Sequence, residues 1–256
     1  MTTSSAVYNG NALYDQLAVR PHKRLLAPGH NVWALVYAAN DGDPKALVVV
    51  FQRDPADPVI PTHVNKRFLY ACSKIASKCG LPFRMMSFEA PLDGQPLDQF
   101  RVSDGNQAPT RAVTGHQWRQ ILSSMGVSAR PTSLMKPVNR ATSSPYHQWQ
   151  RQHLGAVRAV DLDLLGLDPQ GRLERVIELK RAASRPEAWT PYDSDYPNFN
   201  VVARVCEQLN IRFELVFNRY DKQTLVDDLS KLRVFTFRDQ RFRHKTTVDG
   251  RAWLGL

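Results

Sequence analysis

Four charged side chains stand inside two apolar stretches of this sequence, and they are the residues best suited to chemistry. Asp161 and Asp163 occur in AVDLDLLGL, and Glu178 and Lys180 occur in LERVIELKRA. Burying a charge costs free energy unless the charge is paired or binds a metal ion. Because hard cations prefer oxygen ligands, the three carboxylates indicate a site for Mg²⁺, with Mn²⁺ as an alternative.

A β-hairpin is the element expected to bring these charges together. Its turn would be DPQG, residues 168–171, because proline at the second position and glycine at the fourth are typical of a type I turn. Side chains alternate along a strand, so Asp161 and Asp163 would share one face, as would Glu178 and Lys180. A metal ion held there would make hydroxide available near neutral pH, and Lys180 could orient the nucleophile or stabilise the transition state.

The pattern Asp163…Glu178-Leu179-Lys180, on a hairpin followed by a helix, resembles the PD-(D/E)XK nuclease superfamily, which has the restriction-endonuclease-like fold. The resemblance covers roughly residues 146–220. It implies that Asp163 and Glu178 are metal ligands and that Lys180 is the catalytic lysine. Asp161 would be an outer or alternative ligand, and Asp163 is preferred because its distance from the turn is closer to that of the family.

The helix expected before the hairpin, YHQWQRQH from Tyr146 to His153, departs from the family pattern. Many members carry an acidic residue there, whereas no acidic residue occurs here between Asp104 and Asp161. Some branches use histidine or glutamine instead, so His147 or Gln150 would complete the site. Two simpler readings stay open: His147 is a surface residue, or the hairpin is exposed and held by salt bridges between opposite charges on its strands.

The two halves of the chain show the same order of elements: strand, tight hairpin, strand, Pro-rich loop, helix and strand. VWALVYAANDGDPKALVVVFQR, residues 32–53, aligns without gaps with residues 160–181 at an offset of 128. At this offset the four charged positions correspond to uncharged residues, namely Trp33, Leu35, Val50 and Gln52. The first half is therefore predicted to keep the scaffold and lack the chemistry, whether or not it arose by internal duplication.

Most of the net charge of +10 lies in the middle of the chain. Residues 105–160 contain 7 Lys or Arg and no Asp or Glu, so this segment supplies 7 of the 10 excess positive charges. Such a segment favours a polyanionic partner, nucleic acid before an acidic membrane, although a solvated linker would look similar. We expect DNA as the substrate, with RNA as the alternative.

Several other classes of protein are disfavoured. No apolar run is long enough for a transmembrane helix, and the N-terminus does not look like a secretory signal, so an intracellular, cytoplasmic protein is expected. Three cysteines are too few and too badly spaced for a zinc site or a disulfide framework. No glycine loop that would cradle phosphates, no HExxH motif and no Ser-His-Asp signature is evident.

The predicted fold class is α/β. Residues 145–256 would form a restriction-endonuclease-like core, a mixed sheet flanked by helices, with a further helix near 222–232. Residues 1–104 would form a related degenerate module for dimerisation or substrate binding, consistent with a homodimer, and 105–144 a basic helix and linker. The predicted function is a metal-dependent nuclease. The rival predictions are a non-catalytic nucleic-acid-binding or assembly protein, and an enzyme acting on another phosphate ester.

Overall fold

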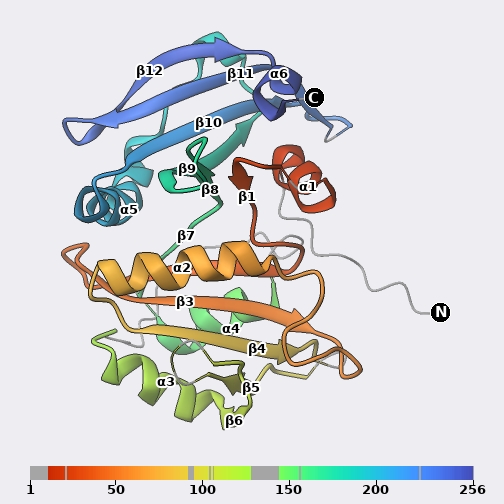
Figure 1. Ribbon diagram of the computed structural model, residues 1–256, viewed down its shortest axis with the longest axis vertical. Helices are drawn as coiled ribbons and strands as arrows, with labels where there is room; N and C mark the ends of the chain where they lie inside the picture. Colours follow the sequence, from red (N-terminus) through yellow and green to blue (C-terminus); the bar gives the residue numbers. More distant parts are fainter. Residues whose placement is uncertain are drawn as a thin grey trace. The chain divides into compact units, whose positions relative to one another are not determined.

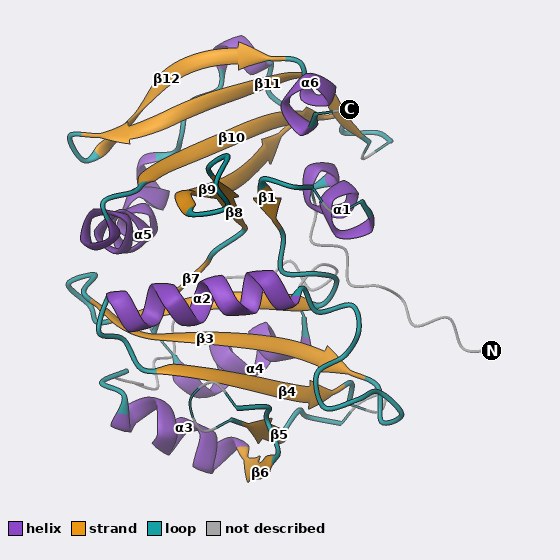
Figure 2. Cartoon of the chain, viewed as in Figure 1, coloured by secondary structure: helices purple, strands orange, loops and turns teal. Residues whose placement is uncertain are grey.

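The computed structural model describes residues 11–20, 22–91, 95–103, 105, 107–127, 144–155, 157–224 and 226–255. The protein is a mixed α/β structure with two mixed six-stranded sheets (Figures 1 and 2). The described residues divide into two compact units: unit 1 lies within Pro28–Asp161, and unit 2 lies within Gly10–Ala27 and Leu162–Leu256. None of the helices in these residues has the length and apolar character that crossing a membrane requires.

Unit 1 contains a sheet in the order β6-β5-β4-β3-β2-β7. Strands β2 and β3 form an antiparallel hairpin, α2 crosses over to β4, which is parallel to β3, and the remaining pairs are antiparallel. The elements are β2 Val32–Ala38, β3 Pro44–Arg53, α2 Lys66–Lys78, β4 Phe83–Glu89, β5 Gln99–Val102, β6 Arg111–Thr114, α3 Gly115–Ser124, α4 Pro145–Leu154 and β7 Arg158–Asp161.

The central strands of unit 1 are buried on both faces, as their continuous apolar sequence predicts. On one face Leu35 and Val50 pack in a cluster with Trp118 of α3 and Trp149 of α4. The alternate residues, which include Val49, are equally buried on the face that α2 covers. Strands β2 and β3 are therefore shielded from solvent along most of their length.

Unit 2 contains a sheet in the order β1-β8-β9-β10-β11-β12. Strands β8 and β9 form an antiparallel hairpin, α5 crosses over to β10, which is parallel to β9, and the other pairs are antiparallel. The elements are α1 Ala12–Val19, β1 Leu25–Leu26, β8 Leu164–Leu167, β9 Leu173–Ala182, η1 Pro186–Ala188, η2 Asp193–Asp195, α5 Tyr196–Leu209, β10 Arg212–Tyr220, β11 Asp227–Arg238, β12 Arg241–Val248 and α6 Gly250–Leu254.

The two units share one plan but exchange one segment. Each sheet runs from a short antiparallel edge strand through a hairpin to a parallel strand and then an antiparallel pair. In unit 1 the helices opposite the crossover helix are α3 and α4, and in unit 2 they are α6 and α1. Segment α1–β1 precedes the hairpin of unit 1 in the sequence but joins unit 2, and α4–β7 precedes the hairpin of unit 2 but joins unit 1. The repeated architecture is confirmed, and the reciprocal exchange is new.

The exchange moves the predicted domain boundaries. A division at residues 104 and 145 would cut unit 1 between β5 and β6 and would assign α4 and β7 to the C-terminal half, whereas the structure places all four elements in unit 1. Most of the predicted linker, residues 128–143, lies outside the described residues.

The helix predicted near residues 222–232 is wrong. β11 begins at Asp227 and pairs antiparallel with β10, with Tyr220 opposite Asp227 and Val216 opposite Val234. The spacing of Leu229 and Leu232 fits a helical stripe as well as a strand, so only the pairing with β10 distinguishes the two. Residues 90–113 contain β5 and the start of β6.

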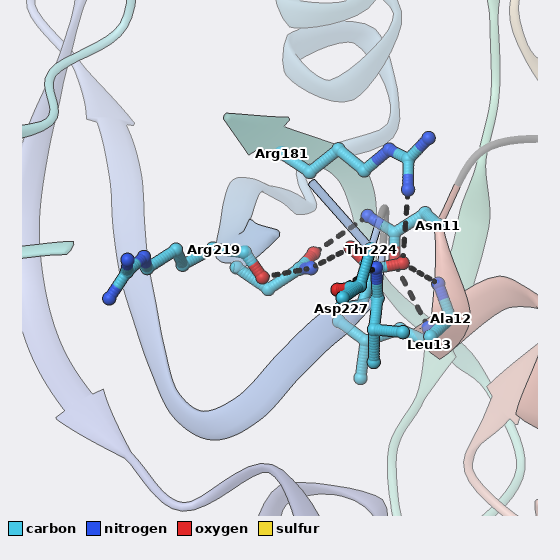
Figure 3. A network of polar contacts seen from close by, with 9 residues as sticks. Asn11, Ala12, Leu13, Arg181, Arg219, Thr224 and Asp227 are labelled. Atoms are coloured by element: carbon cyan, nitrogen blue, oxygen red, sulfur yellow. Dashed lines mark hydrogen bonds and ion pairs between the residues drawn. The ribbon is translucent and has the colours of Figure 1, made fainter. Parts of the chain in front are cut away.

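A buried polar network fastens α1 to unit 2 (Figure 3). The Asp227 carboxylate, whose side chain is fully buried, accepts hydrogen bonds from the backbone N–H of Ala12 at 2.9 Å and from Asn218 Nδ2 at 2.7 Å, and it pairs with Arg181 at 3.2 Å. Asn11, the N-cap of α1, donates from Nδ2 to Asn218 Oδ1 at 2.9 Å and accepts from the N–H of Leu13. The start of the exchanged helix is thus held by one carboxylate and two amides.

We predict that Asp227→Ala lowers the free energy of unfolding by about 2–4 kcal/mol, because it leaves Arg181 and two buried donors without their acceptor. Urea denaturation followed by circular dichroism measures the loss. Asp228→Ala is the matched control, since Asp228 is the exposed next residue of β11 and should cost less than about 1 kcal/mol. Equal losses in the two variants would contradict the role given to the network.

Candidate functional site

Strand β9 carries the two residues at the centre of the candidate site. The hairpin that leads into it forms as predicted: the N–H of Gly171 donates to the carbonyl of Asp168 at 3.0 Å, and Leu167 pairs with Leu173. Ile177 faces the cluster formed with α1 and α6. Alternation along the strand therefore turns Glu178 and Lys180 to the opposite face, which α5 covers.

Glu178 and Lys180 form an ion pair on that face. Lys180 Nζ lies 2.9 Å from Glu178 Oε1, and Glu178 is only 8% exposed. The ammonium group also lies 5.5 Å from the centre of the Phe199 ring of α5, a cation–π contact. A carboxylate buried to this extent requires a partner of opposite charge, and Lys180 supplies it.

Three acidic residues keep Lys180 charged. Burial lowers the pKa of the Lys180 ammonium, but the ion pair with Glu178 and the charges of Asp163 and Asp195 outweigh it and raise the pKa above its ordinary value. Lys180 therefore acts at neutral pH as a cation and hydrogen-bond donor, and it has no lone pair with which to accept a proton.

Asp163 joins the same cluster from the end of β8. The β8–β9 ladder pairs Leu164 with Ile177, and continuing this register by one residue sets Asp163 opposite Glu178. Its carboxylate accepts a hydrogen bond from the backbone N–H of Leu179 at 2.7 Å, where β9 has passed the end of β8. Asp163, Glu178 and Lys180, all in unit 2, are thus brought together as the sequence spacing predicted.

Asp195 is a fourth charged residue of the cluster that sequence reasoning missed. It ends η2 and is the N-cap residue of α5, where its side chain makes no capping hydrogen bond. Its charge contributes to the raised pKa of Lys180. The sequence contained a signal for this residue, because an Asp two residues before Pro197 is typical of a helix start, and α5 begins at Tyr196.

Asp161 does not lie on the same strand as Asp163, contrary to prediction. β7 ends at Asp161 and pairs with β2 of unit 1, with Leu35 opposite Asp161, whereas β8 begins at Leu164 in unit 2. Within unit 1, Asp161 Oδ1 lies 3.8 Å from His147 Nε2. The alternating sequence VDLDLL reads as one strand, but the chain changes sheets at Leu162.

His147 and Gln150 lie on α4, which also belongs to unit 1. Gln150 is buried, and its Oε1 accepts a hydrogen bond from the Tyr37 hydroxyl at 3.3 Å. His147 is partly exposed: its ring packs edge-on against Trp33 at 5.4 Å, and Nδ1 lies 2.7 Å from Ser144 Oγ. Both side chains have partners within the core of unit 1, which is sufficient to explain their positions.

The network around Gln150 is neutral. The hydroxyls of Tyr37 and Tyr146 lie 2.6 Å apart, and Trp118 Nε1 donates to the Tyr146 hydroxyl at 3.1 Å. Burial raises the pKa of Tyr146 to about 12 and raises that of Tyr37 well above its usual range, so neither phenol ionises near neutral pH. These side chains fix α4 against the sheet of unit 1.

The cluster carries carboxylate oxygens, the type of ligand that a hard divalent cation prefers. Asp163 and Glu178 offer carboxylate oxygens on one face of adjacent strands, and Mg²⁺ is commonly held by one or two carboxylates together with water and substrate phosphate. Among the described residues, no group of three or more His, Cys, Asp or Glu side chains is arranged to hold a metal ion by itself. Two protein ligands are therefore what this cluster can supply.

Comparison with known proteins gives no identification. No protein-family model matches the chain, and no curated protein matches it.

We predict that the Glu178–Lys180 pair is energetically coupled. A double-mutant cycle with Glu178→Gln and Lys180→Met, measured by urea denaturation, should give a coupling free energy of about 1–2 kcal/mol, because removing either charge leaves the other poorly solvated. The control cycle is the exposed pair Arg241–Asp193, whose atoms lie 2.6 Å apart and whose coupling should be below about 0.5 kcal/mol. Equal coupling in both cycles would mean that Glu178 is hydrated.

Proposed function

We propose that the protein is a metal-dependent nuclease whose catalytic cluster is Asp163, Glu178 and Lys180 in unit 2. The observation that carries the proposal is a buried carboxylate paired with a lysine on one sheet face, beside a second carboxylate from the neighbouring strand. Burying an ion pair in place of apolar residues rarely adds stability, so a stabilising role is a poor explanation for it.

Unit 1 supports the proposal by contrast. Its hairpin, crossover helix and parallel strand repeat those of unit 2, and at the centre of β2 and β3 the residues that face its crossover helix are apolar, with Ala34, Val49 and Phe51 all buried. These three residues lie on the same face of their sheet as Asp163, Glu178 and Lys180 do in unit 2. The alignment offset of 128 pairs Glu178 with Val50, which lies on the opposite face, so this offset is wrong by one residue. Arg53, at the end of β3, pairs with Glu89 of β4. The centre of this face forms without charge in unit 1, which leaves chemistry as the better reason for charge in unit 2.

The arrangement of unit 2 is compatible with the restriction-endonuclease-like core that the sequence resembles. A hairpin carries the acidic residues and the lysine, and a helix then leads to a strand parallel to the second hairpin strand. The helix packed against the opposite face is α1 and not α4. α4, which carries no acidic residue, belongs to unit 1.

In this mechanism Asp163 and Glu178 would hold Mg²⁺ or Mn²⁺, which when bound neutralises phosphate charge and acidifies a coordinated water. Lys180 stays protonated and so serves as a donor: it can orient the attacking water or hydrogen-bond a phosphoryl oxygen as negative charge builds in the transition state. Phe199 of α5 covers the ammonium group and restricts its orientation. DNA is the preferred substrate and RNA the alternative.

We predict that Asp163→Asn, Glu178→Ala and Lys180→Ala each lower cleavage by about a hundredfold or more. The measurement is a panel of single-stranded, double-stranded and branched DNA and of RNA, each with Mg²⁺, Mn²⁺ or EDTA. Glu207→Ala and Lys222→Ala are matched controls, because both residues are exposed in unit 2, and they should keep the wild-type rate. An unchanged cleavage rate in Glu178→Ala or Lys180→Ala would contradict the assignment of that residue to the catalytic cluster.

The same panel tests the remaining site candidates and the rival function. Asp161, His147 and Gln150 stay predictions as site members, and Asp161→Asn and His147→Ala address them directly. Binding that falls steeply with salt, with no Mg²⁺-dependent cleavage of any substrate, would support a non-catalytic nucleic-acid-binding or assembly protein.

A further inference from the structure

A concave basic pocket lies on the α1 and α6 face of unit 2. Its volume is about 640 Å³, within the range of small-molecule sites. Five basic side chains and no carboxylate occur among the described residues that line it, the basic ones being Arg20, His22, Lys23, Arg24 and Arg175. Its apolar wall is formed mainly by Leu17, Leu25, Trp253 and Leu254. A ligand that fits should therefore combine negative charge with a flat or apolar part.

Arg175 is held in this pocket by the sheet. Gly166 of β8 lies opposite Arg175 in the ladder, and a Cβ atom on Gly166 would come within 2.5 Å of Arg175 Cγ. The glycine therefore leaves the space in which the arginine side chain lies across β8 toward β1. Glu214 lies 3.5 Å from the Arg175 Nε atom, but it also pairs with Arg212 and Lys245, so the surroundings keep an excess of positive charge.

The pKa of His22 is sensitive to the positive charges around the pocket. Burial lowers the pKa of its imidazole, and so do the charges of Arg24 and Arg175. Nδ1 of His22 accepts a hydrogen bond from the backbone N–H of Arg24 at 3.0 Å, which suits the neutral ring. A neutral imidazole adds no further positive charge to the pocket.

We propose that this pocket binds the phosphate of a nucleotide, with the base against the apolar wall around Trp253. Arginine side chains suit phosphate because their planar donors match its oxygens, and an indole ring offers a stacking surface for a base. The nucleotide is either free or the terminal residue of a nucleic-acid strand, since both present the same chemistry. The binding does not depend on the proposed catalytic activity.

The pocket is separate from the catalytic cluster. Arg175 and Lys180 both lie on β9, five residues apart, which is about 17 Å along a strand, and alternation turns them to opposite faces of the sheet. A nucleotide in the pocket would therefore make no contact with the face that carries Glu178 and Lys180. Binding at one place and cleavage at the other are measured independently.

The test is fluorescence polarisation in EDTA, where metal-dependent cleavage is absent. The probe is a labelled single-stranded DNA oligonucleotide with a 5′-phosphate, and the competitors are the unlabelled 5′-hydroxyl form, ATP and inorganic phosphate. The triple variant Arg20→Gln, Lys23→Gln, Arg24→Gln changes exposed side chains only and should weaken binding about tenfold or more. Arg175→Gln is a second variant, and circular dichroism checks that both fold.

The control is Arg204→Gln, Lys222→Gln, Arg243→Gln, which removes the same charge from exposed positions elsewhere in unit 2 and should weaken binding less than about twofold. Preference for the 5′-phosphate form over the 5′-hydroxyl form identifies a strand end, and competition by ATP identifies a free nucleotide. Equal weakening in the two triple variants, competition by inorganic phosphate equal to that by ATP, or no binding by the wild-type protein would overturn the proposal.

Discussion

The parallel pairing of β9 with β10 is the constraint on which the rest of unit 2 depends. Parallel strands cannot be joined by a tight turn, so the chain must cross over, and α5 makes this crossing over one face of the sheet. That face carries Glu178 and Lys180, so the crossover helix places Phe199 against the ammonium group and Asp195 near it. The opposite face is left to α1 and α6, which build the apolar cluster behind the strand.

The same constraint acts in unit 1, where β3 and β4 are parallel and α2 makes the crossing. There the centres of β2 and β3 are apolar on both faces, and a neutral network of hydroxyl, indole and amide groups is buried around Tyr37. Comparing the units separates what the architecture needs from what is added to it. The architecture needs buried apolar central strands, a hairpin and a crossover helix, whereas Asp163, Glu178 and Lys180 are additions that burial makes costly.

Strand β9 also connects the two proposals made for unit 2. Its side chains alternate between a face with a buried acid and lysine and a face that contributes Arg175 to the basic pocket. In the two proposals both features serve phosphate binding, one through a metal ion held by carboxylates and the other through direct positive charge. One strand can therefore present two different environments to a polyanionic ligand, because the sheet itself separates them.

The sequence by itself determined the features that depend on neighbouring residues. These include the turn at residues 168–171, the apolar strands of both halves, the shared face of Glu178 and Lys180, and the repeated order of elements. Alternation along a strand and turn chemistry are local, so these predictions required no knowledge of distant contacts.

Only the tertiary structure decided which segments pair. The sequence VDLDLL alternates without a break, although the partner strand changes from β2 to β9 at Leu162. The placement of Asp161 and Asp163 in different sheets could therefore not be predicted from the sequence. The exchange of α1–β1 with α4–β7 and the identity of β11 as a strand were hidden for the same reason. Each follows from pairing between residues far apart in the sequence, such as Leu25 with Gly166 and Leu35 with Asp161, and side-chain periodicity carries no information about such partners.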